Sequence, residues 1–351
     1  MKIGILTASR TNNNGTDLQA FAMQTLFSKV NPDTEVIDYV CEKLERSHLI
    51  FPSFNLRNIL FIPIKLINNI NHNNFRKKYV IRSKKLYSKE NLSQNDYDAI
   101  VVGSDQIWNL NITGNDLSFF LPFKSKAKKY SYAASLGKTD IREWNDKFNL
   151  KKLLDDFSGV SVREKSGIDA LSQMGISAKH DLDPILCLEK EDWRKIPCKG
   201  KRKKRYVLLY MVEKNEEAIE YAIRYARENS CQVISVNQGI RSIKKVKSKR
   251  FLSVTGWMDY MRDAELIITN SYHGLSFAIA QEKNFRLFML RENPQSNTRM
   301  QSLVETLGLT ECVASENVVK NIEIDWKSVE EKLKKEREAS KEYIKKIAEL
   351  A

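Results

Sequence analysis

The segment AELIITNSYHGLSF, residues 264–277, decides how the rest of the chain is interpreted. The letters ELII form a short apolar run typical of a buried β-strand, and an apolar helical pattern begins at the end of the segment. A turn from strand to helix needs only one or two residues that break regular structure. Here the polar residues Thr269, Asn270, Ser271 and His273 are clustered at the carboxyl end of the strand. This excess of polar side chains indicates a bound ligand.

Apolar strands and helical segments alternate along the whole sequence. In the first half, the strand pattern KIGILT (2–7) is followed by the helix pattern TDLQAFAMQTLFSKV (16–30). The alternation starts again with the strand pattern RYVLLYMV (205–212) and the helix pattern EEAIEYAIRYAREN (216–229), and RFLSV (250–254) is a further expected strand. Near-continuous apolar strands between helices are typical of parallel sheets covered on both faces. The pattern predicts an α/β protein.

The length and the restart of the pattern predict two Rossmann-like domains. A chain of 351 residues exceeds a single ordinary core. We expect an N-terminal domain over residues 1–198, with a basic insertion at about 42–96, and a C-terminal domain over residues 199–324. Residues 325–351 form a long charged helical pattern that is expected to pack on the domains. Ligands bind beyond the carboxyl ends of parallel strands, so two such sheets facing a central cleft would place the site there.

The composition is that of a soluble globular protein. Hydrophobic residues make up 42% and charged residues 29% of the chain, and no stretch approaches the roughly 20 apolar residues of a membrane span. The first residues, MKIGILTASR, are typical of a first strand and not of a secretion signal. The five cysteines are scattered and form no CxxC pair, which argues against disulfides and against a zinc site. We expect a cytoplasmic protein with no metal.

Basic residues give the chain a formal net charge of +14. They gather in three runs, at residues 76–85, 199–205 and 241–250. Such runs suit polyanions, although a solvated loop is the commoner role for any single run. Together they favour an anionic membrane surface over nucleic acid, because the sequence shows no recognition motif and few aromatic residues between the basic ones. No nucleic acid is expected as a partner.

The loop at residues 9–24 follows the first predicted strand. Asn13 and Gly15 can form a tight turn there, and its backbone amides can bind an anion or a hydroxyl group at the amino end of the next helix. A plain helix cap by Asn14 or Thr16 is the alternative. The Gly-Lys-Ser/Thr ending of a P-loop is absent.

A second loop, GSDQIWN (103–109), places Asp105, Gln106 and Asn109 beside Trp108. An aromatic ring next to amide and carboxylate groups is typical of a sugar-binding surface, because the ring can pack on the apolar face of a sugar. The alternative is an Asx-type turn with a packed tryptophan.

Two further loops offer charged groups. Arg163 stands at the end of a predicted strand, where a guanidinium can bind phosphate or carboxylate through two parallel hydrogen bonds, and Glu164 can hold it in place. A surface ion pair between these neighbours is the alternative. The segment KHDLDP supplies His180, Asp181 and Asp183, and a turn before Pro184 explains it equally well.

His273 can donate a proton or bind a phosphate group. Gly274 would let a ligand approach the backbone closely. A lone histidine is usually structural, but the polar cluster around this one favours a functional role. Farther on, Asn297 and Arg299 precede an apolar helical pattern and offer a second basic contact.

Taken together, these segments resemble the polysaccharide pyruvyltransferase family, whose members make pyruvate ketals on cell-surface glycans. The matching segments occur in the order of the family and span nearly the whole chain. They are NNGTDLQAFAMQ (13–24), VVGSDQIWN (101–109), YAASLG (132–137), SVREKSG (161–167), DPILCL (183–188), AELIITNSYHGLSFAIAQEKNF (264–285) and NTRMQSLVETLGL (297–309). Two positions depart from the family pattern, since Asn14 replaces an aromatic residue and Asn284 replaces a proline. Neither change removes a charged group, so both concern the choice of acceptor more than the type of reaction.

The resemblance implies a GT-B-like fold with phosphoenolpyruvate as donor and co-substrate. It implies a sugar or lipid-linked oligosaccharide with two neighbouring hydroxyl groups as acceptor, and no metal or redox cofactor. The reaction needs a general acid, a base for the hydroxyl groups, and cations that hold phosphate and carboxylate. Because acceptors in the family are often lipid-linked, we hypothesise that the basic runs and the apolar segment 56–70 contact the inner membrane face.

The resemblance and the loop chemistry together assign roles to single residues. We expect His273 to be the acid or the phosphate contact, Asp105 to contact or deprotonate the acceptor, and Arg163 to clamp the donor. The expected donor-binding residues are Arg163, Asn270, Ser271, His273 and Arg299. The expected acceptor-binding residues are Asn13, Gly15, Asp105, Gln106, Trp108 and Asn109.

Other functions are compatible with the same sequence features. A glycosyltransferase with a nucleotide-sugar donor uses the same fold and cleft. A non-catalytic basic protein that binds a membrane surface or nucleic acid would depend on residues 241–250 more than on His273. A family member with altered acid–base chemistry is a third alternative.

Overall fold

The computed structural model describes residues 1–46, 56–137, 140–199, 204–236, 243, 246–314 and 323–350. These residues form two compact units. Unit 1 comprises Met1–Cys187 and Lys335–Ala351, and unit 2 comprises Leu188–Lys334.

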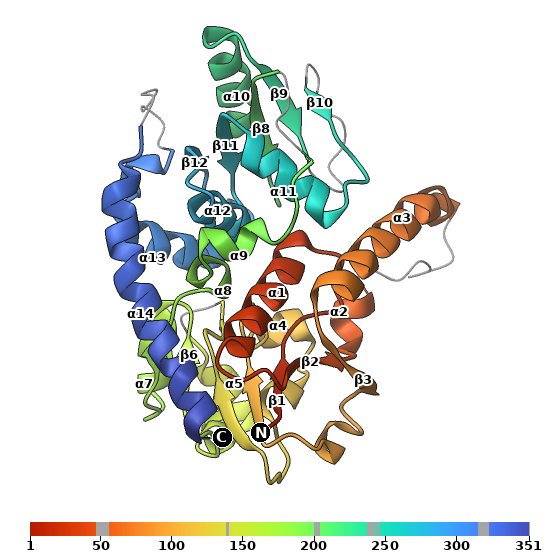
Figure 1. The fold of residues 1–351 in the computed structure, drawn as a ribbon, viewed down its shortest axis with the longest axis vertical. Coiled ribbons are helices and arrows are strands. Elements are labelled where there is room, and N and C mark those ends of the chain that lie inside the picture. The colour runs from red at the N-terminus through yellow and green to blue at the C-terminus, as the bar shows by residue number, and fades with distance from the viewer. Residues whose placement is uncertain are drawn as a thin grey trace. The chain divides into compact units, whose positions relative to one another are not determined.

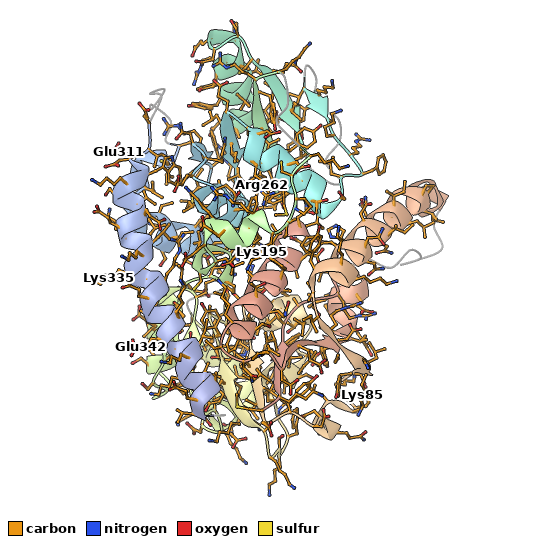
Figure 2. The ribbon with its side chains drawn as sticks, viewed as in Figure 1. Lys85, Lys195, Arg262, Glu311, Lys335 and Glu342 are labelled. Atoms are coloured by element: carbon orange, nitrogen blue, oxygen red, sulfur yellow. The ribbon has the colours of Figure 1, made fainter. Side chains whose placement is uncertain are left out.

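The boundary between the units falls after Cys187. The sequence analysis expected it after residue 198. The reason lies in Arg262, labelled in Figure 2, whose guanidinium donates to the carbonyl oxygens of Trp193 at 2.7 Å and Ile196 at 3.2 Å. These bonds attach the intervening segment to unit 2. The C-terminal helix α14 (Trp326–Leu350) begins in unit 2 and ends in unit 1.

Unit 1 contains a five-stranded sheet in which all neighbouring strands are parallel, with the order β3-β2-β1-β4-β5. Its strands are β1 (Ile3–Leu6), β2 (Thr34–Tyr39), β3 (Arg82–Tyr87), β4 (Ala99–Val102) and β5 (Lys128–Ser131). A two-stranded parallel sheet of β6 (Ser161–Val162) and β7 (Lys179–His180) continues it through a bridge between Ala134 and Val162. Strands β1 and β4 are fully buried, which explains why they are continuous apolar runs.

The helices of unit 1 connect these strands (Figure 1). They are α1 (Asn14–Ser28), α2 (Glu42–Arg46), α3 (Leu56–Tyr79), α4 (Leu110–Thr113), α5 (Arg142–Phe148), α6 (Leu150–Leu154), α7 (Lys165–Ser172) and α8 (Pro184–Cys187), with 3₁₀ turns η1 (Leu92–Gln94) and η2 (Leu117–Phe120).

Unit 2 repeats the architecture with a parallel sheet in the order β10-β9-β8-β11-β12. Its strands are β8 (Tyr206–Tyr210), β9 (Gln232–Ser235), β10 (Lys247–Ser248), β11 (Leu266–Thr269) and β12 (Phe285–Leu287). Its helices before α14 are α9 (Lys190–Arg194), α10 (Glu216–Glu228), α11 (Val254–Asp263), α12 (Tyr272–Ala280) and α13 (Asn297–Leu307), with 3₁₀ turns η3 (Pro294–Ser296) and η4 (Thr310–Cys312). The strand expected at 250–254 is wrong, because Ser253 caps the amino end of α11 through a bond from the Gly256 amide.

The basic insertion expected at about 42–96 supplies part of the fold. Its segment RSKKLY forms β3, an edge strand of the unit 1 sheet with exposed lysines. Charged side chains are usual on edge strands because they discourage pairing with other chains. The basic run at 76–85 therefore covers the end of α3 and the start of β3. Residues 200–203 of the run at 199–205, and residues 241, 242, 244 and 245 of the run at 241–250, lie outside the described residues.

A buried charged cluster joins α3 to α1. The Nδ1 atom of His72 lies 2.6 Å from Oδ2 of Asp17, and Nη1 of Arg76 lies 3.3 Å from Oδ1 of the same carboxylate. Arg76 Nη1 also donates to the carbonyl oxygens of Thr11 at 2.7 Å and Ser9 at 3.3 Å. Burial raises the pKa of Asp17 and lowers the pKa of Arg76. The cluster therefore fixes the loop that follows β1 from the side of the insertion.

Arg76→Ala is expected to lower the free energy of unfolding by about 3–5 kcal/mol, because it removes one partner of a buried ion pair. Lys77→Ala is the matched control, since Lys77 is the next residue of α3 and is exposed; its effect should stay within about 0.5 kcal/mol. Urea unfolding followed by circular dichroism measures both. Equal stabilities of the two variants would show that the cluster does not hold the loop.

Candidate functional site

The Asp105 carboxylate is held in place at the carboxyl edge of the unit 1 sheet. Its Oδ2 accepts a hydrogen bond from the Thr16 hydroxyl at 3.0 Å, and its Oδ1 accepts from the Gln106 amide at 2.7 Å. The Asp105 carbonyl oxygen accepts from the Ser135 amide at 3.0 Å. The first turn of α1 and the loops after β4 and β5 therefore meet at this residue, whose side chain is half-buried.

Gly103 makes this arrangement possible. Its φ is +139°, and a Cβ atom added there would stand 2.0 Å from the carbonyl oxygen of Tyr132. Only glycine can adopt this backbone conformation and approach the neighbouring chain so closely. The turn after β4 therefore depends on the absence of a side chain.

Asn13 is the amino-terminal cap of α1. Its Oδ1 accepts hydrogen bonds from the amides of Gly15 at 2.8 Å and Thr16 at 3.3 Å. The cap is thus Asn13, and not Asn14 or Thr16 as the alternative reading of this loop expected. Asn13 is exposed and Gly15 is buried.

Gln106 and Asn109 hold each other in the turn after β4. The Asn109 amide donates to Gln106 Oε1 at 3.3 Å, and Asn109 Oδ1 caps α4 by accepting from the Asn111 amide at 3.2 Å. The expectation that Trp108 packs on a sugar is not met, because its ring is fully buried. The indole donates to the Phe119 carbonyl oxygen at 2.8 Å and stacks on Phe120 at 5.4 Å. Trp108 is a core residue that anchors the loop.

Arg163 lies in a buried ion pair with Asp183, at 2.8 Å between Nη1 and Oδ2. The same nitrogen is 3.5 Å from the Ser104 hydroxyl, which in turn lies 3.4 Å from Asp183. Glu164 was expected to hold the guanidinium, but its nearest carboxylate oxygen is 4.0 Å away. The surface ion pair considered for Arg163 is also ruled out, since both carboxylates and the guanidinium are almost fully buried.

Glu164 instead holds the loop after β5. Its Oε1 accepts hydrogen bonds from the Ser135 hydroxyl at 2.9 Å, the Leu136 amide at 2.9 Å and the Gly137 amide at 3.0 Å. Hydrogen bonds to a carboxylate are shorter and stronger than those between neutral groups. Glu164 therefore fixes the position of residues 132–137, the segment YAASLG.

The remaining charged residues of the segment KHDLDP have structural partners. His180 pairs with Glu336 of α14 at 3.5 Å, and hydrogen bonding to His180 lowers the pKa of Glu336. Asp181 pairs with Lys179 at 2.9 Å and accepts from the Ser161 hydroxyl. Of the three, only Asp183 joins the cluster around Arg163.

In unit 2, the polar residues after β11 build a strand-to-helix turn. Ser271 caps α12 by accepting from the Gly274 amide at 3.3 Å. The Asn270 side chain accepts from the Val212 amide at 2.8 Å and donates to the Glu213 carbonyl oxygen at 2.7 Å. These bonds join the loop after β11 to the loop after β8, so Asn270 positions the turn.

His273 stands in the first turn of α12, and Arg299 stands in the first turn of α13. The imidazole makes an edge contact with the Tyr272 ring at 5.6 Å, and the Arg299 guanidinium lies over the same ring at 5.3 Å. Tyr272 thus brings the two predicted donor-binding residues together. The sequence contains this tyrosine inside the quoted segment, but no local pattern assigned it a role.

Gly274 has a packing role where a ligand contact was expected. A Cβ atom there would stand 2.6 Å from Thr269 Oγ1 and 2.7 Å from Tyr210 Cδ1. The space beside this backbone is therefore filled by side chains of the protein. One of them, Tyr210, is buried, and burial raises its pKa to about 12. Asn297 is also structural, because its side chain bonds both the amide and the carbonyl oxygen of Leu290.

Two kinds of feature are absent from the described ranges. No three histidine, cysteine, aspartate or glutamate side chains there gather in a way that could hold a metal ion. No helix within those ranges has the length and apolar character needed to cross a membrane.

The sequence matches the family described as polysaccharide pyruvyl transferase over residues 13–290, which is most of the chain. The chain belongs to this family. The match includes the loops around Asp105, Arg163 and His273 and ends before Arg299. No curated protein matches the sequence.

Solved structures with the same fold include two UDP-GlcNAc 2-epimerases. The enzyme from Neisseria meningitidis, bound to UDP-GlcNAc, has a TM-score of 0.50 at 12% identity, over 99% of this chain and 94% of that chain. The enzyme from Methanocaldococcus jannaschii has a TM-score of 0.50 at 16% identity, over 96% of this chain and 92% of that chain. At such identities the likeness shows the fold alone. This pyruvyl transferase family member has the GT-B fold, as the sequence predicted.

Gly103→Ala is expected to destabilise unit 1 much more than Gly175→Ala does. Both glycines have positive φ angles, but a Cβ atom at Gly175 would have its nearest neighbour at 4.0 Å. Gly175→Ala should therefore show only the left-handed backbone penalty of about 1–2 kcal/mol. Gly103→Ala adds a collision with the Tyr132 backbone and should exceed that by at least about 2 kcal/mol. Equal losses in thermal or urea unfolding would contradict the role given to the turn after β4.

Proposed function

We propose that the protein transfers the enolpyruvyl group of phosphoenolpyruvate to a sugar of a cell-surface polysaccharide or of its lipid-linked precursor, and that the product is a pyruvate ketal. Membership of the pyruvyl transferase family supports the transferase class. The observation that carries the choice of donor is the grouping of His273 and Arg299 around Tyr272. An imidazole and a guanidinium at neighbouring helix starts suit a small donor with phosphate and carboxylate groups.

The chemistry assigns each group a step. A proton adds to the methylene carbon of phosphoenolpyruvate, and the electrophilic carbon that results is attacked by one sugar hydroxyl, which loses its proton. The bond from this carbon to the phosphate oxygen then breaks, and phosphate leaves with the electron pair. The second hydroxyl attacks the same carbon, loses its proton and closes the ketal. One donor and one diol thus give one ketal and one inorganic phosphate.

On the donor side, His273 acts as general acid or binds the leaving phosphate, and Arg299 neutralises donor charge. Arg163 is proposed as a second clamp on the donor anions, with Asp183 fixing the direction of its guanidinium. Ser271 and Asn270 act indirectly in this scheme, because their bonds shape the turn that carries His273.

On the acceptor side, Asp105 is the proposed base for a sugar hydroxyl. The hydrogen bond from Thr16 and the bonds around the loop hold its carboxylate in place before substrate binds, which avoids a loss of ordering entropy during the reaction. Asn13, Gly15, Gln106 and Asn109 line or support the same edge of the sheet and are proposed to orient the acceptor.

His273→Asn should lower the rate of phosphate release from phosphoenolpyruvate by about 10²–10⁴-fold, the usual contribution of a general acid or base. His180→Asn is the matched control, because His180 pairs with Glu336 and lies outside the proposed site. The assay couples phosphate release to mass gain of a glycan acceptor. Thermal unfolding of each variant checks the fold. Near-normal turnover of His273→Asn would overturn the assignment.

Asp105→Asn should reduce transfer by a similar factor while leaving donor binding intact. The control is Asp96→Asn, which alters an exposed ion pair with Lys2. Isothermal titration with phosphoenolpyruvate measures donor affinity, and transfer kinetics measure kcat. A change in donor affinity with unchanged kcat would place Asp105 on the donor side instead. Nucleotide release from a nucleotide sugar, with no phosphate release from phosphoenolpyruvate, would favour the glycosyltransferase alternative.

We also propose that α3 contacts an anionic membrane surface when a lipid-linked acceptor is used. Leu66 and Ile67 are each 40% exposed, and Ile70 is 56% exposed, on a helix whose last turn carries the exposed Lys77 and Lys78. Exposed apolar groups beside basic ones suit the interface of an anionic bilayer. Leu66→Ser/Ile70→Ser should weaken co-sedimentation with vesicles that contain phosphatidylglycerol. Binding that does not change with lipid charge or salt concentration would refute the contact.

A further inference from the structure

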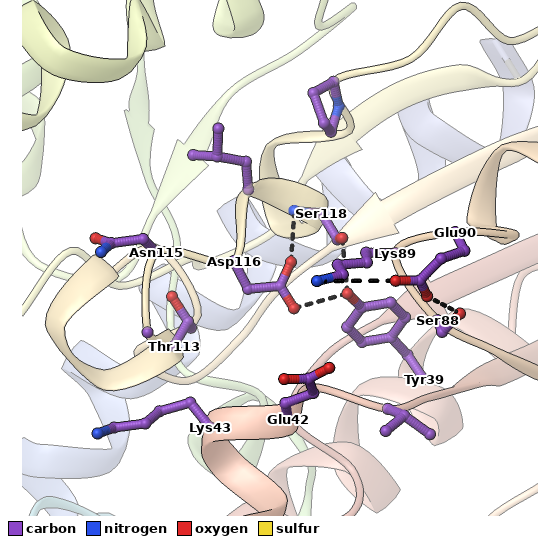
Figure 3. A pocket seen from close by; sticks show the side chains of 14 residues that line it. Tyr39, Glu42, Lys43, Ser88, Lys89, Glu90, Thr113, Asn115, Asp116 and Ser118 are labelled. Atoms are coloured by element: carbon purple, nitrogen blue, oxygen red, sulfur yellow. Dashed lines mark hydrogen bonds and ion pairs between the residues drawn. The ribbon is translucent and has the colours of Figure 1, made fainter.

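A cavity of about 580 Å³ opens at the carboxyl edge of the unit 1 sheet, outside the residues discussed above. It lies where β2 and β3 end, against the turn that joins α4 to η2 (Figure 3). The volume falls within the roughly 300–1,000 Å³ typical of small-molecule sites. The carboxyl edge of a parallel sheet is also where such folds bind ligands.

The charges around the cavity argue against an anionic ligand. Its charged lining residues are Lys43, Lys89, Glu42, Glu90 and Asp116. Carboxylates thus outnumber ammonium groups here, whereas the whole chain carries a net charge of +14. Lys89 is also paired with Glu90 at 3.8 Å. A phosphate or an acidic sugar would meet more negative than positive charge, so the lining suits a neutral ligand.

The cavity wall offers both hydrogen-bond donors and acceptors in fixed positions. The Tyr39 hydroxyl donates to Asp116 Oδ2 at 2.7 Å and lies 2.7 Å from the Ser118 hydroxyl, and Asp116 Oδ1 accepts from the Ser118 amide at 3.0 Å. Burial raises the pKa of Tyr39, which keeps the phenol protonated. Asn115 and Glu42, both labelled in Figure 3, also line the cavity. Mixed carboxylate, amide and hydroxyl groups match the hydroxyl groups of a sugar ring.

The cavity is connected to the proposed acceptor loop by one short helix. Asn109 caps the amino end of α4, and Thr113 and Gly114 at its carboxyl end line the cavity. In the sheet, β2 is two strands away from β4, which is roughly 10 Å at the usual strand spacing. A ligand longer than one sugar ring can therefore extend from Asp105 to the cavity along the same edge.

We propose that this cavity binds a neutral sugar unit of the acceptor glycan, beyond the unit that receives the pyruvate. This inference rests on the proposed function for the identity of the glycan, but the binding itself requires no donor. The cavity would select acceptors by length and by the absence of charge at the second unit.

The test is ligand-observed saturation-transfer NMR on the full chain, without phosphoenolpyruvate. The probes are glucose, galactose and N-acetylglucosamine with the corresponding β-1,4-linked trisaccharides. We expect at least one trisaccharide to bind about tenfold more tightly than its monosaccharide. Glu42→Gln/Asn115→Gly should remove about that factor, because it alters two polar groups of the cavity wall. Both residues are exposed, and glycine accepts the positive φ of +61° that Asn115 adopts, so the turn should keep its shape. Glu143→Gln, an exposed carboxylate on α5, is the control and should bind like the unaltered protein.

Two results would overturn the inference. One is that no trisaccharide binds better than its monosaccharide, and the other is that Glu42→Gln/Asn115→Gly leaves trisaccharide binding unchanged. If inorganic phosphate competes with the trisaccharide, and the double variant abolishes this competition, the cavity is an anion site. That result would also overturn the inference. Failure of the proposed function would give a different result: trisaccharides would still bind, but no phosphate would be released from phosphoenolpyruvate. The two failures are thus separable.

Discussion

The buried ion pair between Arg163 and Asp183 holds together the loops that follow three strands of unit 1. Arg163 follows β6, Asp183 follows β7, and Ser104, which contacts both, follows β4. A guanidinium taken out of water needs a carboxylate partner, and removing either would leave an uncompensated buried charge. The direction of the Arg163 side chain and the path of the loop that carries Asp105 are therefore set by one contact.

Many polar residues at strand ends in this family member hold the protein together before they meet any substrate. Asn13 and Ser271 cap helices, Asn270 joins two loops, and Glu164 binds three donors of the loop after β5. A strand-to-helix turn contains unpaired backbone groups that polar side chains must satisfy. The same side chains thus give a turn the rigidity that a binding site needs.

The insertion after β2 has three roles that its composition did not indicate. It adds the edge strand β3, and residues 88–90 after this strand form one wall of the cavity. It also places His72 against the start of α1 and Arg76 against the loop before that helix. A basic, Asn-rich segment has no strong hydrophobic period, so local patterns could not reveal these contacts. They depend on the sheet that the apolar strands build first.

By itself, the sequence determined the alternation of strands and helices, the two Rossmann-like units, the GT-B fold and the pyruvyl transferase family. These features follow from hydrophobic period and from short motifs, which are properties of neighbouring residues. The tertiary structure decided which polar groups meet. Thr16 and Asp105 are 89 residues apart, and Asp17 and His72 are 55 residues apart. It also made Trp108 a core residue and Tyr272 the common neighbour of His273 and Arg299, because burial and side-chain partners are set by the packing of distant segments.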